Sequence, residues 1–131
     1  MRPTFLASCG KCSATFGYPS LGDFSYGALI LSSVDGRYFS YVEAFWEFPT
    51  RLATLAGNLG KQLRFWDAVA SFADRTENQC WMTGIRCPRC SSANVSLSND
   101  VRCGEVMVPN ATFVEAAALS DDTIRERLSI L

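Results

Sequence analysis

The 131-residue chain contains no histidine and few charged residues. The absence of histidine excludes a Ser-His-Asp triad, a Cys-His dyad and any histidine metal ligand. Charged residues make up 19% of the chain and leave a net charge of −1, which argues against a polybasic binder of nucleic acid or membrane surfaces. The longest clean apolar run, Ala28–Leu31, is far shorter than the roughly 18 residues of a membrane span.

We also expect no secretion signal at the N-terminus. Only Phe5 and Leu6 are strongly apolar before Cys9, whereas a signal peptide carries about 7–15 apolar residues before its cleavage site. We therefore expect a cytoplasmic protein that does not associate with membranes. In that compartment its thiols stay reduced unless a metal holds them.

Apolar residues are plentiful, at 48% of the chain, and predict one folded domain over residues 1–131. Residues 24–32 and 37–44 are rich in aromatic and branched side chains and flank Val34–Gly36, a turn signal. This pattern predicts a β-hairpin in which Gly36 takes a positive φ.

After Pro49 the apolar period changes to that of a helix. The residues of the predicted apolar face are Leu52, Leu55, Leu59, Leu63, Trp66, Ala70 and Ala73. Pro49 or Thr50 is the predicted start, and Gly57 and Gly60 divide the segment into a short helix and a longer one.

The remaining segments are shorter. We expect strands at residues 2–6, 15–18, 95–97 and 101–108, the last two around a Ser98–Asp100 turn, and an alanine-rich helix over 112–119. Ser120 is a predicted N-cap for a C-terminal helix over 123–131. Together these elements predict the α+β class.

Two C-x2-C pairs dominate the chemistry: Cys9 with Cys12, and Cys87 with Cys90. A two-residue gap lets both sulfurs of a tight turn face one ion about 2.3 Å away. Backbone amides of the turn can also hydrogen-bond the thiolates and lessen their repulsion. The spacing therefore favours a metal site.

The segment Cys87-Pro88-Arg89-Cys90-Ser91 resembles the zinc knuckle of zinc ribbon and rubredoxin-like proteins, in which Pro follows the first Cys and a small residue follows the second. Gly10 replaces that Pro in the first pair, and Ser13 follows it. The resemblance covers residues 2–18 and 85–108 and implies knuckle half-sites followed by β-hairpins. It implies metal binding and says nothing about activity.

The two pairs are separated by 74 residues, against about 15–20 in a compact zinc ribbon. The longer loop costs only about 1.4 kcal/mol, since each doubling adds about 0.6 kcal/mol. Structural zinc supplies about 10–16 kcal/mol in zinc-finger peptides, so one shared ion remains favourable. We predict one structural zinc per chain, half-sites at 1–18 and 85–108, an inserted hairpin-helix subdomain at 19–84, and a C-terminal helical segment at 109–131.

Other readings of the cysteines stay open. Iron accepts the same tetrahedral sulfur geometry, and disulfides or a redox C-x-x-C pair are the further alternatives. Cys80 and Cys103 belong to neither pair, and we expect both to be buried small side chains.

No catalytic motif accompanies the metal site: the chain lacks a P-loop, G-x-G-x-x-G and G-x-S-x-G. A closed four-cysteine site also leaves no coordination position for a reacting water. We therefore expect a non-enzymatic, zinc-stabilised module that binds another protein or a second copy of itself, as an inhibitor or immunity-type protein does.

Sixteen aromatic residues and their concentration in one hairpin motivate that expectation. Aromatic side chains are favoured at interface centres, and the candidate partner-binding residues are Tyr38, Tyr41, Phe45 and Trp46. The alternative partner is nucleic acid, in a transcription- or RNA-related role. The candidate contacts for it are Lys11, Arg86, Arg89 and Arg102.

Overall fold

The computed structural model describes residues 2–21, 27–57 and 65–131. Its strands are β1 (Arg2–Cys9), β2 (Thr15–Pro19), β3 (Ala28–Ser33), β4 (Phe39–Glu43), β5 (Trp81–Met82) and β6 (Val95–Val106). Its helices are α1 (Glu47–Ala56), α2 (Phe65–Phe72), α3 (Val114–Ala117) and α4 (Asp121–Ser129). The predicted α+β class is confirmed.

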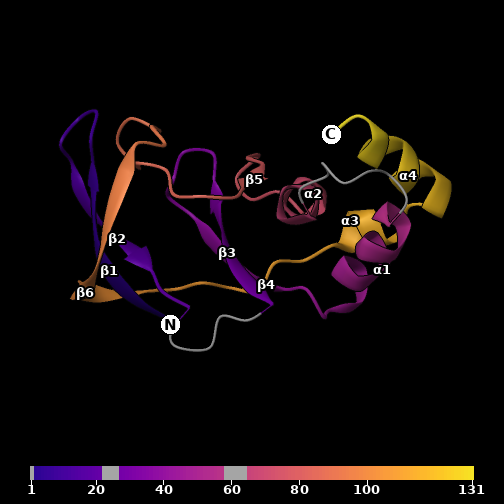
Figure 1. The fold of residues 1–131 in the computed structure, drawn as a ribbon, viewed down its shortest axis with the longest axis horizontal. Helices are drawn as coiled ribbons and strands as arrows, with labels where there is room; N and C mark the ends of the chain where they lie inside the picture. The colour runs from indigo at the N-terminus through magenta and orange to yellow at the C-terminus, as the bar shows by residue number, and fades with distance from the viewer. Residues whose placement is uncertain (1, 22–26, 58–64) are drawn as a thin grey trace.

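The strands form two antiparallel sheets, with the orders β2-β1-β6 and β4-β3-β5. In Figure 1 the first sheet lies at one end of the molecule, the second in the middle, and the four labelled helices at the other end. The segment after β6 runs back past β4 toward the helices, and the Tyr41 N–H donates to the Pro109 carbonyl at 2.9 Å. Ala111 N–H donates to the Tyr41 carbonyl at 2.7 Å, so this segment ties the two ends together.

The first sheet departs from the predicted ribbon on the side of β6. Leu6 pairs with Ser98, but its neighbour Phe5 pairs with Arg102, so Asn99–Val101 bulge out of the ladder. Both halves of β6 therefore run along β1, and the prediction of two strands joined by a turn is wrong. β1 forms backbone hydrogen bonds with both halves of β6, and the bulge contains residues of β6 that have no partner on β1.

The predicted hairpin of β3 and β4 is confirmed, with the pairing running from Ala28 opposite Glu43 to Ser32 opposite Phe39. Gly36 has a φ of 74°, and its N–H donates to the Ser33 carbonyl. The predicted residues 24–26 of the first arm lie outside the described part of the chain.

The helices confirm the predicted period, with shifted bounds. Helix α1 begins at Glu47 and places Pro49 in its first turn, where a missing N–H has no cost. Leu52, Ala70 and Ala73 are buried as predicted, whereas Leu59 and Leu63 lie outside the described residues. Ser120 caps α4 by accepting a hydrogen bond from the Thr123 N–H.

The hydrophobic core lies between the second sheet and the helices. Its buried members are Leu31, Val42, Phe48, Leu52, Ala68, Val69, Ala70, Phe72, Ala73, Trp81, Ala111, Phe113, Ala116, Ile124 and Leu128. None of them belongs to β1, β2 or β6. Among the described residues, no helix is both long and apolar enough to cross a membrane.

Candidate metal centre

Four cysteine sulfurs meet at the edge of the first sheet. Cys9 ends β1, Cys12 lies in the turn to β2, and Cys87 and Cys90 lie in the loop that leads to β6. Cys9 is paired with Val95 in the β1–β6 ladder, which brings the second C-x2-C pair beside the first. All four Sγ atoms lie within 4.8 Å of one another.

The sulfur spacing fits one tetrahedral ion. Four ligands at about 2.3 Å from a metal lie about 3.8 Å from each other in an ideal tetrahedron. The Sγ atoms of Cys9 and Cys90 are 3.5 Å apart, and those of Cys12 and Cys87 are 3.6 Å apart. Because all six cysteines are free thiols, the structure holds no disulfide.

The two knuckles share one backbone design. In the first, the Cys9 N–H donates to the Ala14 carbonyl at 2.9 Å, and the Ser13 N–H donates to the Cys9 carbonyl at 3.0 Å. The second repeats both bonds, from Cys87 to Ser92 at 2.9 Å and from Ser91 to Cys87 at 2.8 Å.

The serine after each pair occupies the small-residue position of the zinc-knuckle pattern. Ser13 and Ser91 both have a φ of 62°, in the left-handed region that favours glycine. Since the same bonds and the same strained residue recur 78 positions apart, the local sequence of each knuckle determines its shape.

Backbone N–H groups point at the buried sulfurs. Those of Lys11 and Cys12 lie 3.3 and 3.4 Å from the Cys9 sulfur. The bond from the Cys12 N–H, together with that from Lys11, lowers the pKa of Cys9 to about 6 against the opposing effect of burial. Burial alone would raise the pKa of Cys87, but its bonds from the Cys90 and Arg89 N–H groups lower it.

The pKa of Cys90 moves in the opposite direction. The Ser92 N–H lowers the pKa of Cys90, but burial and the neighbouring sulfurs of the other three cysteines raise it to about 11. Four sulfurs this close cannot all carry a negative charge without a compensating cation. The arrangement therefore suits a divalent cation that displaces the protons.

The four-cysteine cluster is closed and half shielded from solvent. Cys9 and Cys87 are buried, whereas Cys12 and Cys90 are partly exposed. Over residues 2–21, 27–57 and 65–131 it is the one group of three or more His, Cys, Asp or Glu residues close enough to hold a metal. The predicted set of four is thus brought together as a candidate metal centre.

The two remaining cysteines were expected to be buried, and that prediction is wrong. Cys80 and Cys103 are both exposed. Cys80 lies in the loop before β5, and Cys103 lies on β6, where its Sγ contacts Thr4 Oγ1 at 3.5 Å. β6 lies at an edge of the first sheet, outside the core, so its side chains stay near solvent.

The predicted partner-binding residues separate into two places. Tyr38 (41% exposed) precedes β4 and Phe45 (70% exposed) follows it, with roughly 16 Å of strand between them. Tyr41 and Trp46 are half-buried and pack edge to face at 5.8 Å. The Arg2 guanidinium lies 4.5 Å above the Tyr41 ring.

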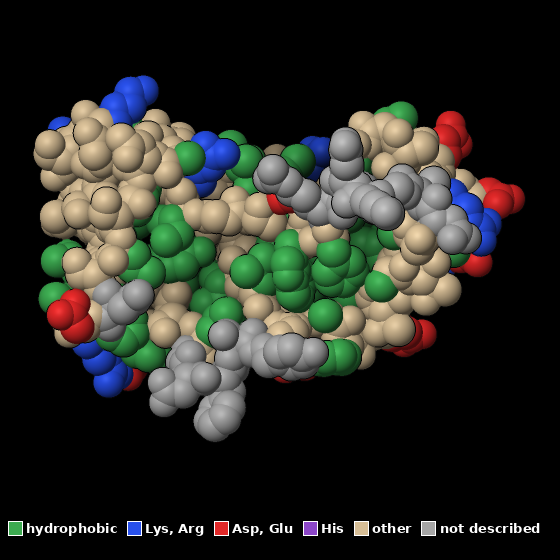
Figure 2. Space-filling model, viewed as in Figure 1, with side chains coloured by type: hydrophobic (Ala, Val, Ile, Leu, Met, Phe, Trp, Pro, Cys, Tyr) green, Lys and Arg blue, Asp and Glu red, His purple; other side chains and the backbone are tan. Residues whose placement is uncertain are grey.

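The predicted basic residues also divide. Lys11 and Arg89 occupy the same position in the two knuckles, and both are exposed. Arg86 Nη1 donates to the Ser91 carbonyl at 3.4 Å, beside the second knuckle. Arg102 lies on β6 and pairs with Glu105 at 3.0 Å. In Figure 2 blue side chains lie at both ends of the molecule, and red ones are more numerous at the helical end.

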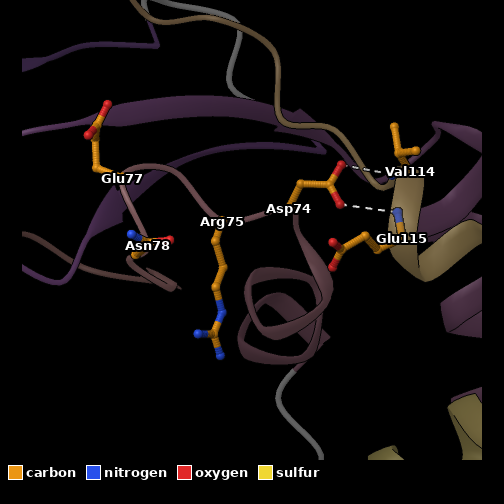
Figure 3. Close-up of a pocket in the computed structure, with 6 residues that line it drawn as sticks. All are labelled: Asp74, Arg75, Glu77, Asn78, Val114 and Glu115. Carbon is orange, nitrogen blue, oxygen red and sulfur yellow. Dashed lines mark hydrogen bonds between the residues drawn. The ribbon is translucent and has the colours of Figure 1, made fainter.

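The structure also contains a pocket of about 580 Å³, whose lining is drawn in Figure 3. Its polar side chains do not converge: Arg75, Glu77 and Asn78 point in different directions. Asp74 accepts hydrogen bonds from the N–H groups of Val114 and Glu115, at 2.8 and 3.2 Å.

The Asp74 carboxylate thus caps helix α3 and is not free to act as a base. It also accepts from Thr112 Oγ1 at 2.7 Å. Burial would raise the pKa of Asp74, but the bonds from Thr112, Val114 and Glu115 lower it. The sequence does not indicate this capping role, because the partners of Asp74 lie about 40 positions away and carry no local signal.

Comparison with other proteins leaves the four-cysteine cluster as the main guide to function. The chain matches no protein-family model, no curated protein and no solved structure.

Proposed function

We propose that the chain binds one structural zinc ion through Cys9, Cys12, Cys87 and Cys90 and acts as a non-catalytic binding module. The observation that carries the proposal is the convergence of four thiols within 4.8 Å from chain segments 74 residues apart. Zinc is the common ion for closed tetrahedral sulfur sites, and iron is the competing one. Metal analysis of protein purified without added metal separates them.

A structural role for the ion follows from the ligand count. With four thiolates bound, no coordination position remains for a water or a substrate. The ion then joins β1 and the loop before β6, in a sheet that contributes no residue to the hydrophobic core. Function is thereby assigned to the protein surface and not to the ion.

The proposed partner is another protein, and its proposed docking surface surrounds Phe45. This ring is 70% exposed and in the chain directly precedes Trp46, whose half-buried ring packs against that of Tyr41. A large exposed aromatic ring beside further aromatic side chains is the composition of an interface centre.

A photo-crosslinking residue placed at position 45 tests this surface. We expect one protein to be captured in the native host from position 45 and not from position 114, where Val114 is 74% exposed on α3. Phe45→Ala should then weaken binding of the purified partner by at least tenfold, and Val114→Ala should leave it unchanged. Equal capture at both positions would contradict the Phe45 surface.

Nucleic acid is the second candidate, and one observation favours it. Residues 1–22 and 84–99 contain four basic residues, Arg2, Lys11, Arg86 and Arg89, and no acidic residue. If nucleic acid is the partner, affinity should fall steeply with salt and should drop in Lys11→Ala and Arg89→Ala. Phe45→Ala would then leave binding unaffected.

A further inference from the structure

The turn between β3 and β4 touches the second knuckle backbone to backbone. Gly36 is buried, and a Cβ at this position would lie 2.6 Å from the Arg86 carbonyl oxygen and 3.2 Å from the Pro88 nitrogen. These two atoms flank Cys87, one of the four clustered cysteines. Glycine is therefore required at position 36 by close approach as well as by its φ of 74°.

The turn has little freedom to move away from the knuckle. The Asp35 carboxylate accepts hydrogen bonds from Ser33 Oγ at 2.7 Å, the Arg37 N–H at 3.0 Å and Gln79 Nε2 at 2.8 Å. Gln79 Oε1 accepts in return from the Asp35 N–H at 3.0 Å. A side chain added at position 36 would therefore displace the backbone around Cys87 rather than the turn.

We propose that this turn positions the metal centre, because Gly36 determines where the backbone of Cys87 lies. The inference rests on the proposed metal function and adds a residue that supports the ligands without touching the ion. Outer contacts of this kind orient the ligands of a metal, and their loss typically reduces metal affinity about 10–100-fold.

The coupling between the turn and the metal site acts in both directions. If the position of the turn changes the affinity for metal, metal binding stabilises the turn by the same free energy. Tyr38 lies on this turn: its N–H donates to Ser33 Oγ, and its carbonyl accepts from the Ser33 N–H, both at 3.0 Å. Metal binding thereby holds an exposed aromatic side chain in place.

A matched pair of asparagine variants tests this positioning role of the turn. Gly84 also has a positive φ, of 84°, but a Cβ there meets nothing within 4 Å. Asparagine tolerates the left-handed region, so Gly36→Asn and Gly84→Asn share similar backbone strain and differ in the steric clash. We expect zinc affinity, measured by chelator competition, to fall about tenfold or more in Gly36→Asn and to stay within about twofold in Gly84→Asn.

The cobalt-substituted proteins supply a readout that a general loss of stability does not move. The thiolate-to-cobalt absorption of Gly36→Asn should shift from that of the unsubstituted protein, and that of Gly84→Asn should not. If the unsubstituted protein binds no zinc, the proposed function itself fails. If it binds zinc and the two variants bind equally well, the function stands and the positioning role of Gly36 is overturned.

Hydrogen exchange of the unsubstituted protein covers the case in which Gly36→Asn does not fold. Removal of zinc by a chelator should accelerate exchange of the Gly36 and Tyr38 amides at least tenfold more than that of Ile124 and Leu128 in α4. Equal acceleration at both places would overturn the link between the metal and the turn.

Discussion

The two ends of the molecule are stabilised by different means. The helical end contributes large buried side chains such as Leu52, Ile124 and Leu128, each at most 2% exposed. The buried apolar residues of the first sheet are Ala7, Cys9 and Pro19, all of them small. At about 25 cal/mol per Å² of buried apolar surface, such residues contribute little, so under the proposed function a bound metal ion would take the place of a core there.

This division explains how a 74-residue separation between the cysteine pairs is compatible with one site. The intervening chain has its own strand pairing and forms the hydrophobic core together with residues 111–128. The two ends are joined by the Pro109–Ala111 segment beside β4 and by the contact of Gly36 with the second knuckle. Under the proposed function, a metal ion would add a further link between β1 and the loop before β6.

The largest expected effect comes from removing a ligand. Cys87→Ser should reduce bound zinc from about one ion per chain to nearly none and accelerate amide exchange in β1 and β6 far more than in α4. The fluorescence emission of Trp66 and Trp81 should change less than the amide exchange in β1 and β6, because both side chains contact the helical core. Cys80→Ser, at an exposed position outside the cluster, is the matched control and should keep its zinc. Full zinc binding by Cys87→Ser would contradict the shared site.

The opposite end is tested by Leu52→Ala, which leaves a cavity at a fully buried position of α1. We expect the free energy of unfolding to fall by about 2–5 kcal/mol in denaturant titrations. The folded variant should still bind one zinc ion, since Leu52 lies in the core and not in the first sheet. Leu97→Ala, at a position 38% exposed on β6, should change stability by no more than about 0.5 kcal/mol. Loss of zinc from folded Leu52→Ala would remove the contrast between the ends.

The distance along the chain between interacting residues decides which features the sequence alone predicts. The two cysteine knuckles, the Val34–Gly36 turn and the Ser120 cap were predictable, because each depends on residues within a few positions. The convergence of the two knuckles was predictable for another reason, since two matched C-x2-C pairs suit one ion. The path of β6 was not, since its register is set by pairing with β1 about 90 residues away. The exposure of Cys80 and Cys103 was missed for the same reason, because residue type does not reveal where the core ends.

An intermediate effect is expected at Asp74, whose carboxylate caps α3 from a distant segment. Asp74→Ala should lower the free energy of unfolding by about 1–2 kcal/mol at pH 7. Because folding lowers the pKa of Asp74, its contribution is complete above the unfolded value near 3.9 and is lost as the pH falls through the lower folded value. Denaturant titrations at pH 7 and in the acid range should show the difference between variant and parent shrinking. A difference independent of pH would argue against a capping carboxylate.

The smallest effect concerns the two serines that follow the cysteine pairs. Ser13 and Ser91 have the same positive φ, so glycine should relieve the same strain in each and raise stability by up to about 1 kcal/mol. Ser96→Gly, at an exposed position of β6, should instead lower stability, because extended backbone gains nothing from glycine. Equal gains in Ser13→Gly and Ser91→Gly, measured with zinc bound, would mean that the two knuckles are energetically as well as geometrically equivalent. Unequal gains would show that the contacts around one knuckle, above all the β3–β4 turn against the second, alter its response to the same local change.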